Sequence, residues 1–184
     1  MRLIEWKRSI GMKIEIITGI LLIISLFLLT SCKSEKSSLE TVDKVDINKF
    51  MGDWYVIGVI PNFIEKGAIN GLESYKLNEK GNVEITYTLQ KNGKKKNMSA
   101  KGFIQNKKNT KWKVQFIWPI KFPYYVIDLE ENYQYTVIGV PNRKYVWIMS
   151  REPQISDKTY NQILARLDKK GYDISKIKRM EQKY

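Results

Sequence analysis

Histidine is absent from the 184 residues of the chain, and cysteine occurs only once, at Cys32. A Ser-His-Asp triad, a Cys-His pair and an ordinary zinc site all need residues that the chain does not contain. The glycines form no phosphate-cradling motif, and Glu130 and Glu131 fall at an expected turn, where solvated charge is the ordinary interpretation. We therefore expect a protein that is not an enzyme, with no cofactor, no metal site and no internal disulfide.

Long apolar runs are also scarce, and the longest covers residues 16–29. Four basic residues precede it, and a charged region followed by an apolar region is the order of a secretion signal. A membrane-spanning helix is the alternative, but it needs about 20 apolar residues and this run is shorter. We expect residues 1–31 to be a signal peptide, and a start at Met12 instead of Met1 would leave that prediction unchanged.

The segment Leu29-Thr30-Ser31-Cys32 resembles the bacterial lipobox, in which a signal peptidase exposes a cysteine that is then acylated. The resemblance implies that Cys32 is the first residue of the mature protein and carries fatty-acyl groups such as palmitate. An ordinary signal peptide with an unmodified thiol is the alternative. Lys33 stands where an aspartate would favour retention in an inner membrane, so the expected location is the cell envelope, at the outer membrane.

Basic residues exceed acidic ones, with 32 Lys and Arg against 19 Asp and Glu, for a formal charge of +13. Removal of the signal would take away four basic and two acidic residues and leave +11. A basic balance is typical of proteins that bind nucleic acid or anionic envelope surfaces, or it serves solubility alone. No arginine-rich helix or nucleic-acid motif is present, so we expect no nucleic-acid partner.

Residues 32–47 are polar and rich in Ser, Lys and Glu, which predicts a flexible tether. Residues 48–184 are expected to form one domain, because the length suits a single core. Short β-branched and aromatic runs separated by turn signals predict an all-β, eight-stranded antiparallel barrel with up-and-down connections. The expected strands cover residues 54–60, 70–78, 83–90, 98–106, 111–118, 124–130, 133–140 and 143–150.

After the last strand the apolar period changes to that of a helix. Ser156 is a candidate N-cap, the apolar residues Tyr160, Ile163, Leu164 and Leu167 share one helical face, and Gly171 is a stop signal. The strands at 54–60 and 145–150 are apolar on both faces, so one face would fill an interior and the other would pack under the helix. The pattern predicts one C-terminal helix outside the barrel.

Three motifs resemble those of the lipocalin family. Gly52-Asp53-Trp54 resembles its G-x-W motif, Glu131-Asn132-Tyr133 is similar to its T-D-Y turn, and the segment 145–153, which contains Arg151, resembles its closing arginine motif. The last segment and the lipobox are most similar to the bacterial lipocalins, which are outer-membrane lipoproteins. The resemblance implies a barrel in which the Arg151 guanidinium lies over the Trp54 indole at the closed end, a structural role.

The resemblance also implies a lumen that holds one small hydrophobic molecule, with a fatty acid or a lysophospholipid as the leading candidate. For each aromatic candidate, filling the core is as reasonable an expectation as touching ligand. The lysines of residues 91–96 either attract an acidic head group or are solvated tips. The alternative function is an adhesive or structural envelope lipoprotein with a basic surface, and the expected state is a monomer or weak dimer. The candidate ligand-binding residues are Phe50, Tyr75, Phe116, Tyr124, Tyr135 and Trp147.

Overall fold

The structure is a computed structural model that describes residues 38–183. The expected signal peptide and Cys32 lie outside the described residues. Among residues 38–183, no helix combines the length and apolar character that crossing a membrane requires.

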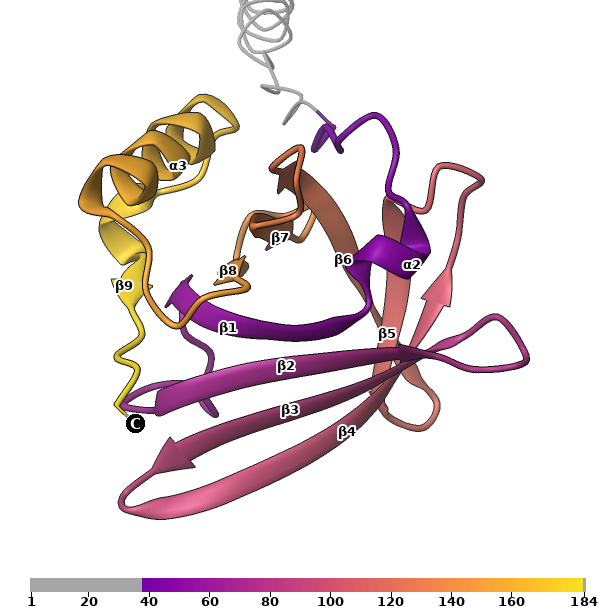
Figure 1. The fold of residues 1–184 in the computed structure, drawn as a ribbon, viewed down its shortest axis with the longest axis horizontal. Coiled ribbons are helices and arrows are strands. Elements are labelled where there is room, and N and C mark those ends of the chain that lie inside the picture. The colour runs from indigo at the N-terminus through magenta and orange to yellow at the C-terminus, as the bar shows by residue number, and fades with distance from the viewer. Residues whose placement is uncertain (1–37, 184) are drawn as a thin grey trace, which may run out of the picture. The chain divides into compact units, whose positions relative to one another are not determined.

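One antiparallel sheet closes into a barrel (Figure 1). Consecutive strands pair from β2 through β8, β8 pairs with β1, and β1 pairs with β2, so the predicted eight-stranded up-and-down barrel is confirmed. A ninth, two-residue strand pairs with Gly58 and Val59 at the end of β1. The strands are β1 (Gly52–Val59), β2 (Ile69–Leu77), β3 (Val83–Lys91), β4 (Lys94–Ile104), β5 (Lys111–Ile117), β6 (Ile120–Leu129), β7 (Tyr135–Gly139), β8 (Val146–Ser150) and β9 (Lys178–Arg179).

The two ends of the barrel differ. The connections β1–β2, β3–β4, β5–β6 and β7–β8 lie at one end, which we call the open end. The short helix α2 (Ile47–Phe50) precedes β1 at the other, closed end. Asp46 caps α2 by accepting hydrogen bonds from the amides of Asn48 and Lys49. Phe50, the last residue of α2, is fully buried, so α2 closes this end of the barrel.

Strand alternation divides the apolar residues into an inner and an outer cluster. In β1, Trp54 and Val56 face the lumen and Ile57 faces outward. A register irregularity between Val56 and Gly58 shifts the alternation, so that Val59 again belongs to the inner cluster. A Cβ atom at Gly58 would lie 2.8 Å from the Tyr160 hydroxyl, so glycine allows the outer helix to approach β1 closely.

That outer helix is α3 (Asp157–Lys169), followed by the 3₁₀ helix η1 (Ile174–Lys176). The Ser156 hydroxyl accepts a hydrogen bond from the Thr159 amide, as its capping role predicts. Tyr160, Ile163 and Leu167 are buried in the outer cluster against β1 and β8. The predicted C-terminal helix is therefore confirmed, together with its apolar face.

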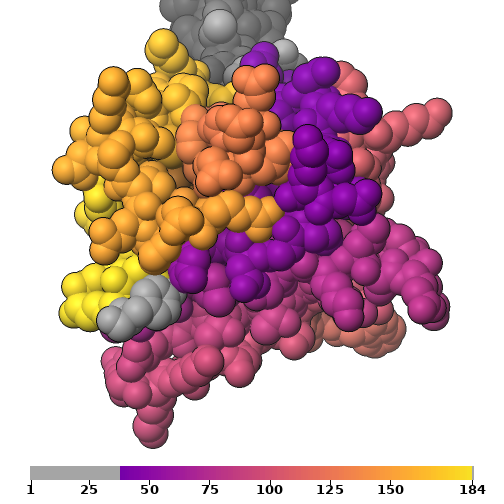
Figure 2. Space-filling model, in the orientation of Figure 1, coloured from indigo at the N-terminus to yellow at the C-terminus, as the bar shows by residue number. Residues whose placement is uncertain are grey.

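The flexible tether predicted for residues 32–47 is wrong where the structure describes it. Leu39 and Val45 are buried, at 5% and 0% exposure, and Val42 packs against the inner cluster. The Val42 amide donates to the Val126 carbonyl at 3.0 Å, and the Val45 amide donates to the Lys108 carbonyl at 2.9 Å. Figure 2 shows this N-terminal segment lying against the strands. Its apolar residues recur every third position, and they add to the barrel's core instead of tethering it.

Candidate functional site

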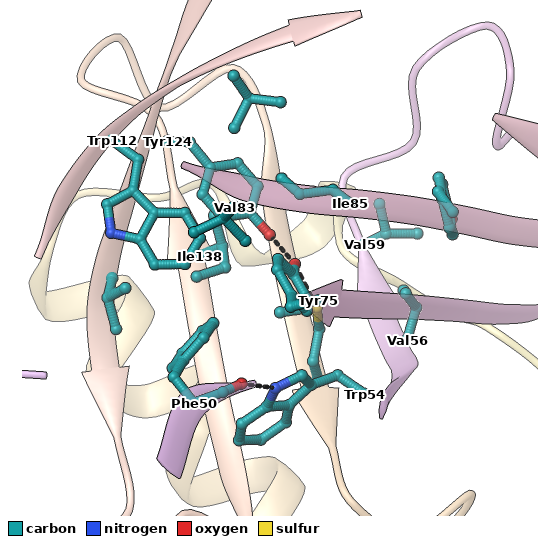
Figure 3. Close-up of a cluster of buried hydrophobic side chains, with 14 of the residues drawn as sticks. Phe50, Trp54, Val56, Val59, Tyr75, Val83, Ile85, Trp112, Tyr124 and Ile138 are labelled. Atoms are coloured by element: carbon teal, nitrogen blue, oxygen red, sulfur yellow. Dashed lines mark hydrogen bonds between the residues drawn. The ribbon is translucent and has the colours of Figure 1, made fainter. Parts of the chain in front are cut away.

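Five aromatic side chains fill the half of the lumen nearest the closed end (Figure 3). They are 0–5% exposed and touch through their rings, with centroids 5.2 Å apart for Phe50 and Trp54 and 5.9 Å apart for Trp112 and Tyr124. The Trp54 Nε1–H donates to the Phe50 carbonyl at 2.8 Å. A ligand would rest on this packed layer, which we call the aromatic floor: Phe50, Trp54, Tyr75, Trp112 and Tyr124.

Arg151 covers the aromatic floor on the side of the closed end. Its guanidinium lies 3.7 Å from the Trp54 ring centroid. Its Nη1 donates to the Asp53 carbonyl at 2.7 Å, and its Nη2 donates to the Lys49 and Met51 carbonyls at 2.8 and 2.9 Å. The expected stacking is therefore present, and the guanidinium also joins α2 to β1.

A carboxyl group lies directly on the floor. Glu73 is 5% exposed, and its Oε2 accepts hydrogen bonds from the hydroxyls of Tyr75 and Tyr124, the latter at 3.0 Å. The two tyrosine hydroxyl oxygens also lie within hydrogen-bonding reach of each other, so the two hydroxyl protons are shared among three oxygens. Burial raises the pKa of Glu73 to about 7, although both tyrosine hydrogen bonds act in the opposite direction. The lumen therefore contains an acid that is partly protonated near neutral pH.

A second carboxyl group enters the lumen from the β1–β2 loop. Glu65 Oε1 accepts from the Trp147 indole N–H at 2.5 Å and from the Tyr87 hydroxyl at 3.3 Å, and its Oε2 accepts from the Asn62 amide at 3.1 Å. Burial raises the pKa of Glu65 as well. Glu65 therefore fixes the Trp147 ring and links the loop to β3 and β8.

Apolar side chains that remain partly accessible line the lumen toward the open end. Met98, Ala100 and Trp147 are partly buried against the inner cluster. Phe122 pairs with Val114 and precedes Tyr124 on the same strand face, whereas Phe116 lies at the open end of β5 beyond the register irregularity that follows Val114. Both are about half exposed, at 50% and 48%. We call this set the mouth wall: Met98, Ala100, Phe116, Phe122 and Trp147.

The six candidate residues thus fall into three groups. Phe50, Tyr75 and Tyr124 belong to the floor, whereas Phe116 and Trp147 belong to the mouth wall. The prediction that Tyr135 lies along the cavity is wrong. Its neighbours Thr136 and Ile138 are buried on the inward face, so Tyr135 points outward, where its hydroxyl accepts a hydrogen bond from Arg166 Nη2 at 3.0 Å.

Sequence reasoning missed both carboxyl groups. Glu73 had a usable signal, because it stands two residues before Tyr75 in a strand and must share its face. Glu65 lies in a loop, where no periodicity reports the direction of a side chain. Met98, Ala100 and Phe122 could have been found by extending the same alternation along β4 and β6.

A pocket of about 350 Å³ lies elsewhere, on the outside of the closed end. Its lining is polar and charged, from Lys49, the turn 131–134 and Arg151. The Arg151 guanidinium is already engaged with three backbone carbonyls there. This pocket is therefore poorly suited to an apolar molecule, and the lumen is the better candidate.

An eight-stranded antiparallel barrel with a packed floor and an accessible apolar mouth defines a class of proteins that enclose one small hydrophobic ligand. Residues 45–182 match the model of the lipocalin-like domain, and the chain belongs to the lipocalin family. Members of this family are generally binding or carrier proteins for small hydrophobic molecules, rather than enzymes.

Curated relatives match most of the chain. Temperature-induced lipocalin-1 of Arabidopsis thaliana is 31% identical over 159 residues, covering 81% of this chain and 86% of that protein. Outer membrane lipoprotein Blc of Citrobacter freundii is 28% identical over 156 residues, covering 82% of this chain and 88% of that protein. The solved structure of insecticyanin from Manduca sexta aligns with a TM-score of 0.63 at 19% identity, over 78% of this chain and 84% of that one, which supports the fold alone.

Proposed function

We propose that this lipocalin is a lipid-anchored carrier of single-chain lipids, a fatty acid or a lysophospholipid, in the cell envelope. The observation that carries the proposal is the mouth wall, an accessible apolar surface that ends on a closed aromatic floor. Burial of an acyl chain contributes about 25 cal/mol of binding free energy for each Å² of apolar surface that leaves water. A single chain suits a lumen of this class, which holds one small molecule.

The charges of the lumen favour one orientation of the lipid. A carboxylate or phosphate placed on the floor would lie close to Glu73 and Glu65, so like charge would oppose it. Lys96 precedes Met98 and Ala100 on the inward parity of β4, nearer the open end, and is exposed. The tail therefore enters first, and an acidic head group stays at Lys96.

The envelope role rests on Cys32 and on the relatives. In this proposal the lipobox-like segment would supply an acylated cysteine seven residues before Leu39, where the described barrel begins its packing. Two relatives that are 28% identical to this chain are named outer membrane lipoproteins. These points support an acylated Cys32 and an outer-membrane location, which mass spectrometry of the membrane-extracted protein would test.

The experiment that tests ligand binding fills the lumen without removing a native side chain contact. Ala100→Trp places an indole in the mouth wall, and Lys101→Trp places one at the next, exposed position on the outer face. We expect Ala100→Trp to abolish binding of a fluorescent fatty acid. In the unmodified protein, palmitate or lysophosphatidylcholine should displace the bound probe. Lys101→Trp should bind as the unmodified protein does, and thermal unfolding would verify that both variants fold.

The head-group orientation has its own matched pair. Lys96→Glu should weaken fatty-acid binding by about tenfold, since it replaces an attractive charge with a repulsive one near the mouth. Lys95→Glu makes the same charge change on the outward parity of the strand and should have little effect. Equal losses in the two variants would contradict the proposed orientation, and binding by Ala100→Trp would contradict the proposed site.

A further inference from the structure

The hairpin formed by β5 and β6 exposes several large apolar side chains to solvent. Ile117 and Trp118 are 70% and 84% exposed, and Ile120 is 53% exposed. Together with the half-exposed Phe116 and Phe122 they form the apolar tip, residues 116–122, at the open end of the barrel (Figure 1). Single exposed apolar residues are ordinary, but five within seven residues of one hairpin mark an interaction surface.

Basic residues without acidic ones surround this tip. Between Ile85 and Ile127 the sequence contains ten lysines and no Asp or Glu. Lys101, Lys113 and Lys121 are exposed on the outward parity of β4, β5 and β6, and the register places Lys113 opposite Phe103. The Lys121 ammonium lies 3.7 Å from the Phe103 ring centroid, a cation–π contact that holds this charge on the outer face of the sheet. The hairpin thus combines an apolar end with a positive flank.

We propose that the apolar tip docks on an anionic phospholipid membrane. Tryptophan is favoured at the boundary between head groups and acyl chains, and exposed isoleucine and phenylalanine gain by entering it. Lysines just behind an inserted apolar element lie at the level of the lipid phosphates, where each contributes attraction to an anionic surface. A positive flank with no acidic residue complements a lipid surface of negative charge.

The chain before the barrel gives the tip access to a particular membrane, a step that rests on the proposed acylation of Cys32. Seven peptide steps from Cys32 to Leu39 span at most about 25 Å. Leu39 lies 3.3 Å from the ideal Cβ position of Gly139, which pairs with Tyr125 of β6. From Tyr125 to Ile120 the strand rises about 17 Å. The anchor's reach therefore exceeds the distance along β6 to the tip, and both can meet one bilayer.

The docked orientation would also bring the opening of the lumen to the membrane surface. Phe116 and Phe122 belong to the mouth wall and to the apolar tip, so an inserted tip brings the open end to the bilayer. A lipid tail could then pass between bilayer and lumen with little exposure to water.

Vesicle binding by the unacylated mature chain, made with Cys32→Ser, tests the tip without the anchor. Vesicles of phosphatidylglycerol and phosphatidylcholine should bind the protein, with a blue shift of tryptophan emission, whereas phosphatidylcholine alone should bind weakly. Trp118→Ser should lower the partition constant by about tenfold. Phe63→Ser is the comparison variant, because Phe63 has the same 84% exposure and lies at the same end of the barrel, in the β1–β2 loop, but outside the apolar tip, so its loss of binding should be clearly smaller than that of Trp118→Ser.

Charge is tested by two triple variants that remove the same three charges. Replacing Lys101, Lys113 and Lys121 by Gln should weaken vesicle binding at least tenfold more than replacing Lys76, Lys80 and Lys107 by Gln, three exposed lysines near the closed end. Equal effects of Trp118→Ser and Phe63→Ser, equal effects of the two triple variants, or self-association that consumes the tip in place of vesicle binding would overturn the proposal. Acyl-chain displacement in solution is measured separately, so failure of one proposal is distinguishable from failure of the other.

Discussion

Replacement of Glu73 by Gln tests whether the lumen carboxyl destabilises the barrel at neutral and alkaline pH. Glu73 is almost fully buried, and its Oε2 accepts from the hydroxyls of Tyr75 and Tyr124. A glutamine keeps an oxygen for both donors and cannot ionise. The variant therefore resembles the protonated state of Glu73 at every pH.

The size of the effect follows from the pKa of Glu73. Burial raises the pKa from 4.5 to about 7, so the folded state binds more protons than the unfolded state between these values. Stability from the neutral carboxyl is fully present below pH 4.5 and is lost as pH rises through 7. At about 1.36 kcal/mol per pH unit, the loss is on the order of 3 kcal/mol. For a domain of this size that is a fall in Tm of roughly 6–12 °C.

The assay is thermal unfolding of the mature chain between pH 5 and pH 8, followed by tryptophan fluorescence. We expect the wild-type Tm to fall across this range and the Glu73→Gln Tm to fall less, with the remaining slope due to Glu65, whose pKa is also raised by burial. Glu84→Gln changes an exposed carboxylate on the adjacent strand and should follow the wild type. A Glu73→Gln variant that keeps the full wild-type slope, or that is less stable at pH 8, would refute the reasoning.

Three further perturbations probe the closed end, the loop carboxyl and the N-terminal segment. Arg151→Lys should lower stability by about 2 kcal/mol, because an ammonium cannot reproduce the stacking on Trp54 together with three carbonyl contacts, and an unchanged Tm would argue against it. Trp147→Phe removes the N–H donor to Glu65, so urea unfolding should show a loss of about 1–2 kcal/mol and a steeper fall of stability with rising pH. Deletion of residues 32–37 should leave the Tm unchanged, whereas deletion of residues 32–45 should cost about 3 kcal/mol or more, because it removes buried Leu39 and Val45.

The barrel and its outer helix could be predicted because their residues alternate. In β1 and β8 both faces are apolar, and that sequence pattern by itself requires a second layer. Aromatic character alone predicts a place in the cavity for Tyr135, whereas its strand parity, set by Thr136 and Ile138, points it outward to Arg166. The alternation of side chains along a strand predicts which face a residue occupies, and residue type alone does not.

Two features depended on contacts that sequence periodicity does not encode. Glu65 enters the lumen from a loop whose path is set by hydrogen bonds to Asn62 and Trp147. Leu39 and Val45 stand among polar residues, so composition predicted a tether, yet backbone pairing with Val126 and Lys108 holds the segment against the barrel. In both cases long-range hydrogen bonds fix a segment whose local composition favours irregular structure.

Because the lumen contains a group that titrates near neutrality, ligand affinity and protonation should be linked. An acyl chain that covers Met98 and Trp147 would exclude solvent from the part of the lumen next to Glu73 and Glu65, and exclusion of solvent favours the neutral form of a carboxyl. By linkage, affinity should rise as pH falls from 8 to 6. Lysophosphatidylcholine is the suitable probe, since its own charge does not change in this range. Fluorescent-probe displacement should show a smaller pH dependence in Glu73→Gln, and an affinity that is independent of pH in the wild type would place the bound chain away from the aromatic floor.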